Sequence, residues 1–223
     1  MRRRQARWAA LALGLATAGA AAHADGLRLS DGREAVAAGI VIAAPQPVAG
    51  PVELRAPADP TLDRHGRVRG QLRASDGSWL QATLVEQGRA VVAPAGDVPA
   101  AVLTELLARE RDARSAGRGL WAAGATGPWP AERVAAPRGS FTLVHGTVRA
   151  VVRRHDYSYL DFGSDWRRDF SVRIEQRDLK RLAAAGIEPA ALVGRRVLVR
   201  GWLFESAGPM LELVHPAQLE VLE

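Results

Sequence analysis

The sequence of 223 residues lacks cysteine, which excludes disulfide bonds and cysteine-ligated metal sites. It also lacks paired metal-binding histidine motifs, a Gly-x-Ser-x-Gly elbow and a glycine-rich phosphate loop. We therefore expect no bound cofactor. The histidines beyond the N-terminal segment are scattered, and two that lie beside strand ends are expected to be structural: His145 and His215.

Long apolar runs are confined to the N-terminus. Residues 1–24 read MRRRQARWAALALGLATAGAAAHA, with four arginines, an alanine-rich apolar stretch and a final small-x-small pattern. This order is typical of a secretory signal cleaved after Ala24. The alternative is an uncleaved anchor, although a membrane span needs ~20 strongly apolar residues. We expect an exported protein, periplasmic or secreted, without stable membrane insertion after cleavage.

Lysine is almost absent, because Lys180 is the only one and arginine supplies the other basic side chains. The formal net charge of +6 falls to +2 when Arg2, Arg3, Arg4 and Arg7 leave with the signal and no acid leaves with them. A charge this small gives little support for nucleic-acid binding by itself.

The expected mature chain divides at a segment rich in Ala, Gly and Pro. This segment, WAAGATGPWPAERVAAPRG, has no apolar period and is typical of a linker. We place a first domain at residues 25–122, a linker at 123–138 and a second domain at 139–223.

In the first domain, apolar patterns predict strands in GLRLSDG, EAVAAGIVIAA, PVELRA and RAVVAP, and a hairpin in RVRGQLRASDGSWL that turns at residues 75–77. The segment LQATLVEQG predicts a short helix closed by Gly88. Apolar residues at helical spacing from Val102 to Leu107 predict a helix of about four turns. Leu120-Trp121 is expected to fold back onto the strands.

In the second domain, Phe141, Leu143 and His145 alternate, and five strand patterns follow in GTVRAVVRR, YSYLDFG, DFSVRIEQ, RRVLVRGWLFE and PMLELV. The segment RDLKRLAAAG predicts a helix before the last two of these. Five strands with one helix between the third and the fourth is the element order of an OB barrel.

Several ordered motifs between residues 62 and 121 carry a family resemblance. They are LDRHGRVRGQL, DGSWLQATLVEQGRAVVAP and LLARERDARSAGRGLW. With an Asp-x-x-Gly-Arg turn, a hairpin, a helix and strand, and a charged helix ending in Gly-Leu-Trp, they resemble the second half of a staphylococcal nuclease-like (thermonuclease) domain. The expected fold is mainly β with helices: a nuclease-like OB barrel followed by a second five-stranded OB-like barrel.

The resemblance implies cleavage of phosphodiesters with Ca²⁺, two phosphate-binding arginines, a glutamate general base and metal-binding aspartates. Such groups are needed because the pentacoordinate phosphorane gathers negative charge and the attacking water must lose a proton. Asp63 and Arg67 fall on the family's aspartate and second arginine.

The family's first half is poorly matched. When the sequences are aligned on Gly39-Ile40, Val36 replaces the first arginine, Val41 a metal-binding aspartate and Ala44 the general base. The second metal-binding aspartate has no counterpart. We therefore expect that nuclease activity has been lost, since the loss of one such group typically costs ~10²-fold or more.

Nearby charged residues are poor substitutes. Arg33 lies three positions before Val36, and an odd offset along a strand directs its side chain to the opposite face. Asp31 and Glu34 lie on the turn, away from the strand end that would hold the metal.

Three roles remain open for Arg67: a turn arginine that pairs with Asp63, a retained anion contact without chemistry, or a catalytic residue. His65, at the variable position of the same turn, is expected to be an aromatic ring that packs there.

The second domain resembles a module that follows nuclease-like domains in exported bacterial proteins, through YLDFGSDWRRDF, VRGWL and GPMLELVHPAQLEVL. Its candidate binding residues combine aromatic rings for stacking with arginines for phosphate contact: Tyr157, Tyr159, Trp166, Arg167 and Arg168. The alternative is that Trp166 and Phe170 belong to the core, while Asp165 and Asp169 neutralise the two arginines.

Together these patterns predict an exported binding protein whose thermonuclease-like domain has lost its catalytic residues. Its partner is expected to be an envelope protein or a polyanion. The alternative is an active Ca²⁺-dependent nuclease that hydrolyses DNA or RNA, and a third possibility is a purely structural partner protein.

Overall fold

The computed structural model describes residues 27–43, 50–55, 61–122 and 128–222. The expected signal segment and Ala44 lie outside these ranges. Within them the protein is mainly β with three α-helices and several small sheets, which confirms the expected fold class. No helix in the described ranges is long and apolar enough to cross a membrane.

The first half of the described chain folds into short strands and two α-helices. The strands are β1 (Ala35–Ala37), β2 (Ile40–Ile42), β3 (Glu53–Leu54), β4 (Thr61–Leu62), β5 (Val68–Gly70), β6 (Leu72–Arg73) and β7 (Ala90–Val92). The helices are α1 (Leu80–Glu86), α2 (Ala100–Ser115) and the 3₁₀ turn η1 (Gly119–Trp121). Strand β5 lies between β1 and β4, β2 pairs with β7, and β3 pairs with β6.

Local sequence signals account for the boundaries of these elements. Helix α1 ends before Gly88, whose φ of +64° is a left-handed conformation that favours glycine. The hairpin turn closes at Ala74, whose N–H donates to the Ser78 carbonyl, and Gly77 supplies a second positive φ. Both features agree with the sequence-based expectation.

The second half contains nine strands, one α-helix and three 3₁₀ turns. The strands are β8 (Trp129–Pro130), β9 (Phe141–Thr147), β10 (Ala150–Arg153), β11 (Tyr157–Asp161), β12 (Ser171–Glu175), β13 (Arg196–Trp202), β14 (Phe204–Ser206), β15 (Gly208–Glu212) and β16 (Leu219–Leu222). The helical elements are α3 (Gln176–Ala184), η2 (Ala131–Arg133), η3 (Pro189–Leu192) and η4 (Pro216–Gln218). Helix α3 lies between β12 and β13, as the pattern predicts.

These strands form two sheets, in the orders β10-β11-β12-β15-β14 and β16-β13-β9-β8. Only residues 148–149 separate β9 from β10, and only Leu203 separates β13 from β14, so the same segments continue from one sheet into the other. This cyclic order, with β12 and β15 parallel, is consistent with an OB-like barrel.

The segment expected to be a linker differs from that expectation. Residues 123–127 lie outside the described ranges, but β8 pairs in parallel with β9, and Ala131 is buried in the second-half core. The periodicity of apolar residues did not predict this strand, because β8 is only two residues long and contains a proline.

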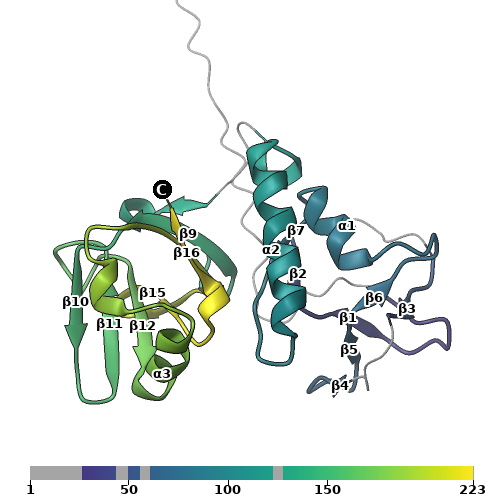
Figure 1. Cartoon of the computed structure of the whole chain (residues 1–223), viewed down its shortest axis with the longest axis horizontal. Coiled ribbons are helices and arrows are strands. Elements are labelled where there is room, and N and C mark those ends of the chain that lie inside the picture. The colour runs from purple at the N-terminus through teal and green to yellow at the C-terminus, as the bar shows by residue number, and fades with distance from the viewer. Residues whose placement is uncertain (1–26, 44–49, 56–60, 123–127, 223) are drawn as a thin grey trace, which may run out of the picture.

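Three apolar clusters hold the fold together. The first joins β1, β5, α1 and α2, and the second fills the C-terminal barrel. The third lies between the two halves, where Val91 packs with Phe141, Leu143 and Leu198. Figure 1 shows α2 standing between α1 and the C-terminal strands, so this helix faces both halves.

Candidate functional site

The best-preserved family motif forms a tight turn between β4 and β5. The Asp63 carboxylate accepts hydrogen bonds from Nε and Nη2 of Arg67 at 2.8 and 2.5 Å, and from the backbone N–H groups of Arg67 and His65. Both side chains are mostly buried, with 17% and 16% exposed for Arg67 and Asp63. The turn arginine that pairs with Asp63 is therefore present in the structure.

The same contacts set the ionisation of Asp63. Burial acts to raise the pKa of this carboxyl, but the hydrogen bonds from Arg67 and from the backbone of His65 outweigh it and lower the pKa to about 2. Asp63 is thus a carboxylate at any pH near neutrality, and it forms an ion pair with Arg67. This arrangement leaves Arg67 paired rather than free to neutralise a phosphate.

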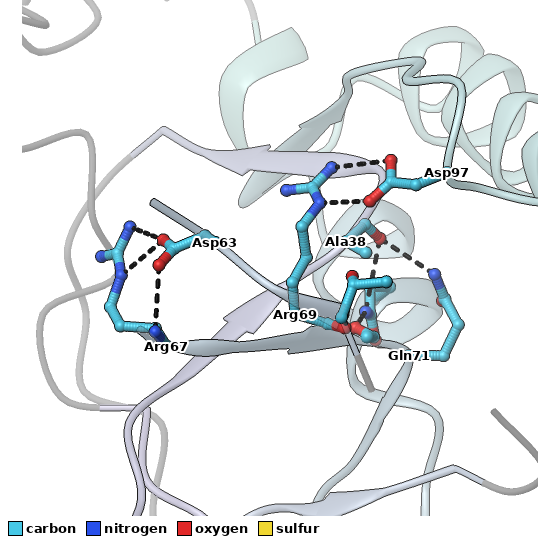
Figure 2. Close-up of polar contacts among 9 residues, drawn as sticks. Ala38, Asp63, Arg67, Arg69, Gln71 and Asp97 are labelled. Carbon is cyan, nitrogen blue, oxygen red and sulfur yellow. Dashed lines mark hydrogen bonds and ion pairs between the residues drawn. The ribbon is translucent and has the colours of Figure 1, made fainter. Parts of the chain in front are cut away.

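A second arginine lies beside the first, and the sequence patterns did not identify it. Arg69 is the register partner of Val36 across β1 and β5, so the two side chains share one face of the sheet. Its Nε donates to Asp97 at 2.6 Å, and this hydrogen bond lowers the pKa of Asp97. Figure 2 shows Arg67 and Arg69 projecting to the same side of β5, each against its own carboxylate.

Arg69 thus stands next to the strand position where the family carries its first arginine. The i, i+2 spacing of Arg67 and Arg69 could have identified Arg69 from the sequence, because this spacing places both side chains on one face of a strand. Its acid partner comes from the loop before α2, and no local pattern links the two positions. Each of the two arginines forms an ion pair with one carboxylate, so these four side chains together carry no net charge.

Two glutamine side chains form hydrogen bonds with backbone groups near β5. Gln71 donates to the Ala38 carbonyl at 3.0 Å (Figure 2). Its side-chain oxygen accepts from the Trp79 indole. Gln81 is fully buried, accepts from the Leu72 N–H and donates to the Gly70 carbonyl. These bonds satisfy backbone groups that would otherwise be buried without partners.

The other positions aligned with the family site are apolar or outside the described ranges. Val36 is half-buried on β1, between the buried Ala35 and Ala37. Val41, on β2, packs against the cluster between the two halves, next to residues such as Phe141. The position that the resemblance leads us to expect as a metal ligand therefore contributes to an apolar contact in this chain.

The remaining acids near the N-terminus are engaged with arginines of the same turn. Asp31 accepts from Nε of Arg33 at 2.7 Å, and Glu34 lies 3.5 Å from Arg28. In the described ranges, no three His, Asp or Glu side chains lie close enough together to hold a metal ion. Hydrogen bonds from Arg33 lower the pKa of Asp31.

His65 differs from the expectation of a packed ring, because its side chain is exposed and accepts a hydrogen bond from Nε of Arg64. The β-barrel histidines are structural. His215 caps η4 by accepting from the Ala217 N–H, and burial lowers its pKa. Burial, followed by the charge of Arg196, also lowers the pKa of His145 on β9.

The candidate binding residues of the second half lie on the outer face of the five-stranded sheet and on the loop after β11. Tyr157 and Tyr159 share this face, with ring centroids 6.3 Å apart. Trp166 is 57% exposed, whereas Phe170 is buried in the core. The expectation that Trp166 belongs to the core is therefore wrong, because the loop carries its ring outward.

The acids of this loop do not neutralise its arginines, which corrects the alternative interpretation. Asp165 accepts from the backbone N–H of Arg167, and Asp169 accepts from the backbone N–H of Asp165. Arg167 instead stacks over Trp166, with its guanidinium carbon 4.5 Å from the ring centroid. Among the described residues, Arg168 is exposed and forms no ion pair.

Comparison with known proteins finds a family match within the first half. The family model of the staphylococcal nuclease homologues matches residues 49–123. This match begins after the segment that holds Val36 and Val41. No curated protein matches the chain. Among solved structures it is similar to an OBody, AM1L10, bound to hen egg-white lysozyme, with 17% identity over 38% of this chain and 81% of that chain and a TM-score of 0.28. Residues 49–123 therefore form part of a staphylococcal nuclease-like domain.

Proposed function

We propose that this chain is an exported, non-catalytic binding protein. Its thermonuclease-like domain serves as a scaffold, and the outer face of the C-terminal five-stranded sheet contacts an envelope protein or a polyanion. The proposal includes cleavage of the signal after Ala24. The domains of this proposal are residues 25–122 and 139–223, joined through the β8 segment.

The observation that carries this proposal is the environment of Val41. In the family this position provides a metal-binding carboxylate, which must face water or substrate to hold a cation. Here Val41 is partly buried, packs against the apolar cluster of Val91, Phe141, Leu143 and Leu198, and also lines an opening between the two halves. A binding role is supported because the position that would serve catalysis now contributes to the contact between the halves.

Arg67 and its neighbour Arg69 give the same indication. Phosphoryl transfer needs guanidinium groups that already point at the phosphate and are free to donate to it as negative charge develops. Arg67 and Arg69 are each engaged by a carboxylate, Asp63 and Asp97. The loop after β11, in contrast, offers an exposed Trp166 together with Arg167 and Arg168, which form no ion pair among the described residues.

Incubation of the purified protein with DNA and RNA, with Ca²⁺ or with a chelator, tests the loss of catalysis. We expect no metal-dependent cleavage. Cleavage that requires Ca²⁺ and disappears in Arg67→Ala would contradict the proposal and favour the alternative nuclease.

A binding titration over salt then separates the two partner classes. Phosphate contacts release counterions, so the affinity for a polyanion must fall steeply as salt rises. Binding to an envelope protein through apolar and aromatic contacts should change little. Trp166→Ala is expected to weaken binding in either case.

A further inference from the structure

A pocket of about 260 Å³ opens on the outer face of the five-stranded sheet. Five strands, β10, β11, β12, β14 and β15, and the loop after β11 contribute to it, so it is held by the barrel rather than by one flexible segment. Its lining combines apolar, aromatic and polar side chains: Val152, Arg154, Tyr159, Asp161, Trp166, Ser171, Ser206, Ala207 and Met210.

Several polar groups of this pocket have no side-chain partner. Among the described residues, no hydrogen bond or ion pair engages the Arg154 guanidinium, the Tyr159 hydroxyl or the Ser206 hydroxyl. Asp161 accepts from the Ser171 hydroxyl at 3.0 Å and pairs with no arginine of the described ranges. The pocket therefore presents both donors and acceptors for a ligand to use.

The aromatic and apolar part of the lining includes Trp166, Tyr159 and Ala207. Trp166 is 57% exposed, and its ring is covered on one side by Arg167. Tyr159 lies on β11, where its neighbours in sequence point into the core. Ala207, at the edge, has a φ of +70°, the only positive value of a non-glycine residue in the described ranges. Such a conformation costs energy and is maintained only where the surroundings demand it.

The net charge of the pocket lining indicates which class of ligand it can bind. Its lining contains one cation, Arg154, and one anion, Asp161, so it carries no net charge. A phosphate group entering the pocket would meet the Asp161 carboxylate as well as the Arg154 guanidinium, so it would gain no net electrostatic attraction there. A ligand with many hydroxyl groups, in contrast, can donate to Asp161 and accept from Arg154 and Tyr159.

We infer that this pocket binds a neutral saccharide unit of a glycan, with the apolar face of the sugar ring against Trp166. The inference rests on the proposed non-catalytic role of this face and goes beyond the envelope protein or polyanion proposed as its partner. Glycoside hydrolysis canonically uses two carboxylates. This pocket is lined by one, so it binds the sugar without cleaving it.

The test is calorimetric titration of the purified protein with three neutral oligosaccharides: chitotriose, cellotriose and maltotriose. We expect at least one to bind, with an affinity that changes less than about twofold over the salt range in which a polyanion would lose much more. Trp166→Ala should weaken this binding about tenfold or more, because an aromatic anchor dominates such contacts. Asp161→Asn should weaken it through the lost charge-assisted hydrogen bonds.

Trp202→Ala is the matched control, because Trp202 is also half-exposed, at 49%, but lies outside this pocket. It should leave the affinity unchanged. If none of the three sugars binds, or if Trp202→Ala weakens binding as much as Trp166→Ala, the inference is wrong.

The outcome also distinguishes this inference from the proposed function. Salt-dependent binding of an oligonucleotide that is lost in Trp166→Ala, without sugar binding, would overturn the saccharide assignment and leave the non-catalytic role intact. Ca²⁺-dependent cleavage of nucleic acid would overturn the proposed function whatever the sugars do.

Discussion

Arg200 and Glu110 form a buried ion pair between the two halves of the chain, with 2.7 Å between Nη1 and Oε1 and 1% of each side chain exposed. Glu110 lies on α2 and also accepts from the Val92 N–H, while Nη1 of Arg200 donates to the Val92 carbonyl. Arg114 and Glu220 form a second pair across the same contact, at 2.8 Å. The charged network and the apolar cluster around Phe141 together join the two halves.

Arg200→Met should lower the free energy of unfolding by about 3–5 kcal/mol, because it leaves Glu110 buried without its countercharge. Urea denaturation followed by circular dichroism measures this change. Arg153→Met is the control, since Arg153 is exposed on β10 and forms no ion pair in the described ranges. Equal losses in the two variants would mean that the buried pair is not important for stability.

Val41→Asp would restore the family's residue type at this position, yet we expect no Ca²⁺-dependent cleavage. The new carboxylate would enter an apolar cluster, so the free energy of unfolding should fall by roughly 1–3 kcal/mol or more. Val221→Asp makes the same change at a 40% exposed position of β16 and should cost little. Recovery of Ca²⁺-dependent cleavage in Val41→Asp would refute this view of the site.

The Asp63–Arg67 pair should make stability depend on pH. Because the folded pKa of Asp63 is lowered to about 2, from an ordinary value of about 3.8, its contribution is complete above the ordinary value. That contribution is lost as pH falls through the folded pKa. Allowing for solvent screening, it amounts to roughly 1–2 kcal/mol.

Asp63→Asn should therefore be less stable than the natural chain at pH 7, and the difference should shrink toward pH 2. Denaturation at a series of pH values measures it. Asp112→Asn, an exposed carboxyl of α2 without an ion pair in the described ranges, should show no such pH-dependent gap.

Gly88→Ala should destabilise the protein by about 3 kcal/mol or more. Its φ is +64°, and an added Cβ would collide with the backbone carbonyl of Arg118. Gly186→Ala is a matched control with a φ of +77° and open space around its Cβ, and should cost only about 1 kcal/mol. Thermal denaturation of the two variants separates the clash from the backbone strain, and similar melting temperatures would contradict the close contact.

Local signals predicted much of the architecture. The helix before Gly88, the hairpin at residues 75–77 and α2 depend on nearest neighbours and on 3.6-residue periodicity, which the sequence displays directly. Strands β8 and β16 were missed, because a two-residue strand and a C-terminal edge strand leave no clear period.

The candidate site was predictable only in part. The Asp63–Arg67 turn is local, since four residues separate its members. The partnership of Arg69 with Asp97 spans 28 positions, and it arises from the approach of the loop before α2 to β5. The exposure of Trp166 also depends on tertiary packing, because the same Trp/Phe pattern fits a core or a surface equally well.

The sequence by itself determined that the chain lacks cysteine chemistry and that residues 62–121 carry nuclease-like motifs, and it led to the expectation that Val36 and Val41 stand where the family has polar residues. These are matters of residue identity and spacing. Only the tertiary structure decided that Val41 packs against the cluster between the halves, that Glu110 and Arg200 form a buried ion pair, and that Trp166 borders an open pocket. Contacts between segments about 90 residues apart depend on the packing of whole domains, which no local pattern records.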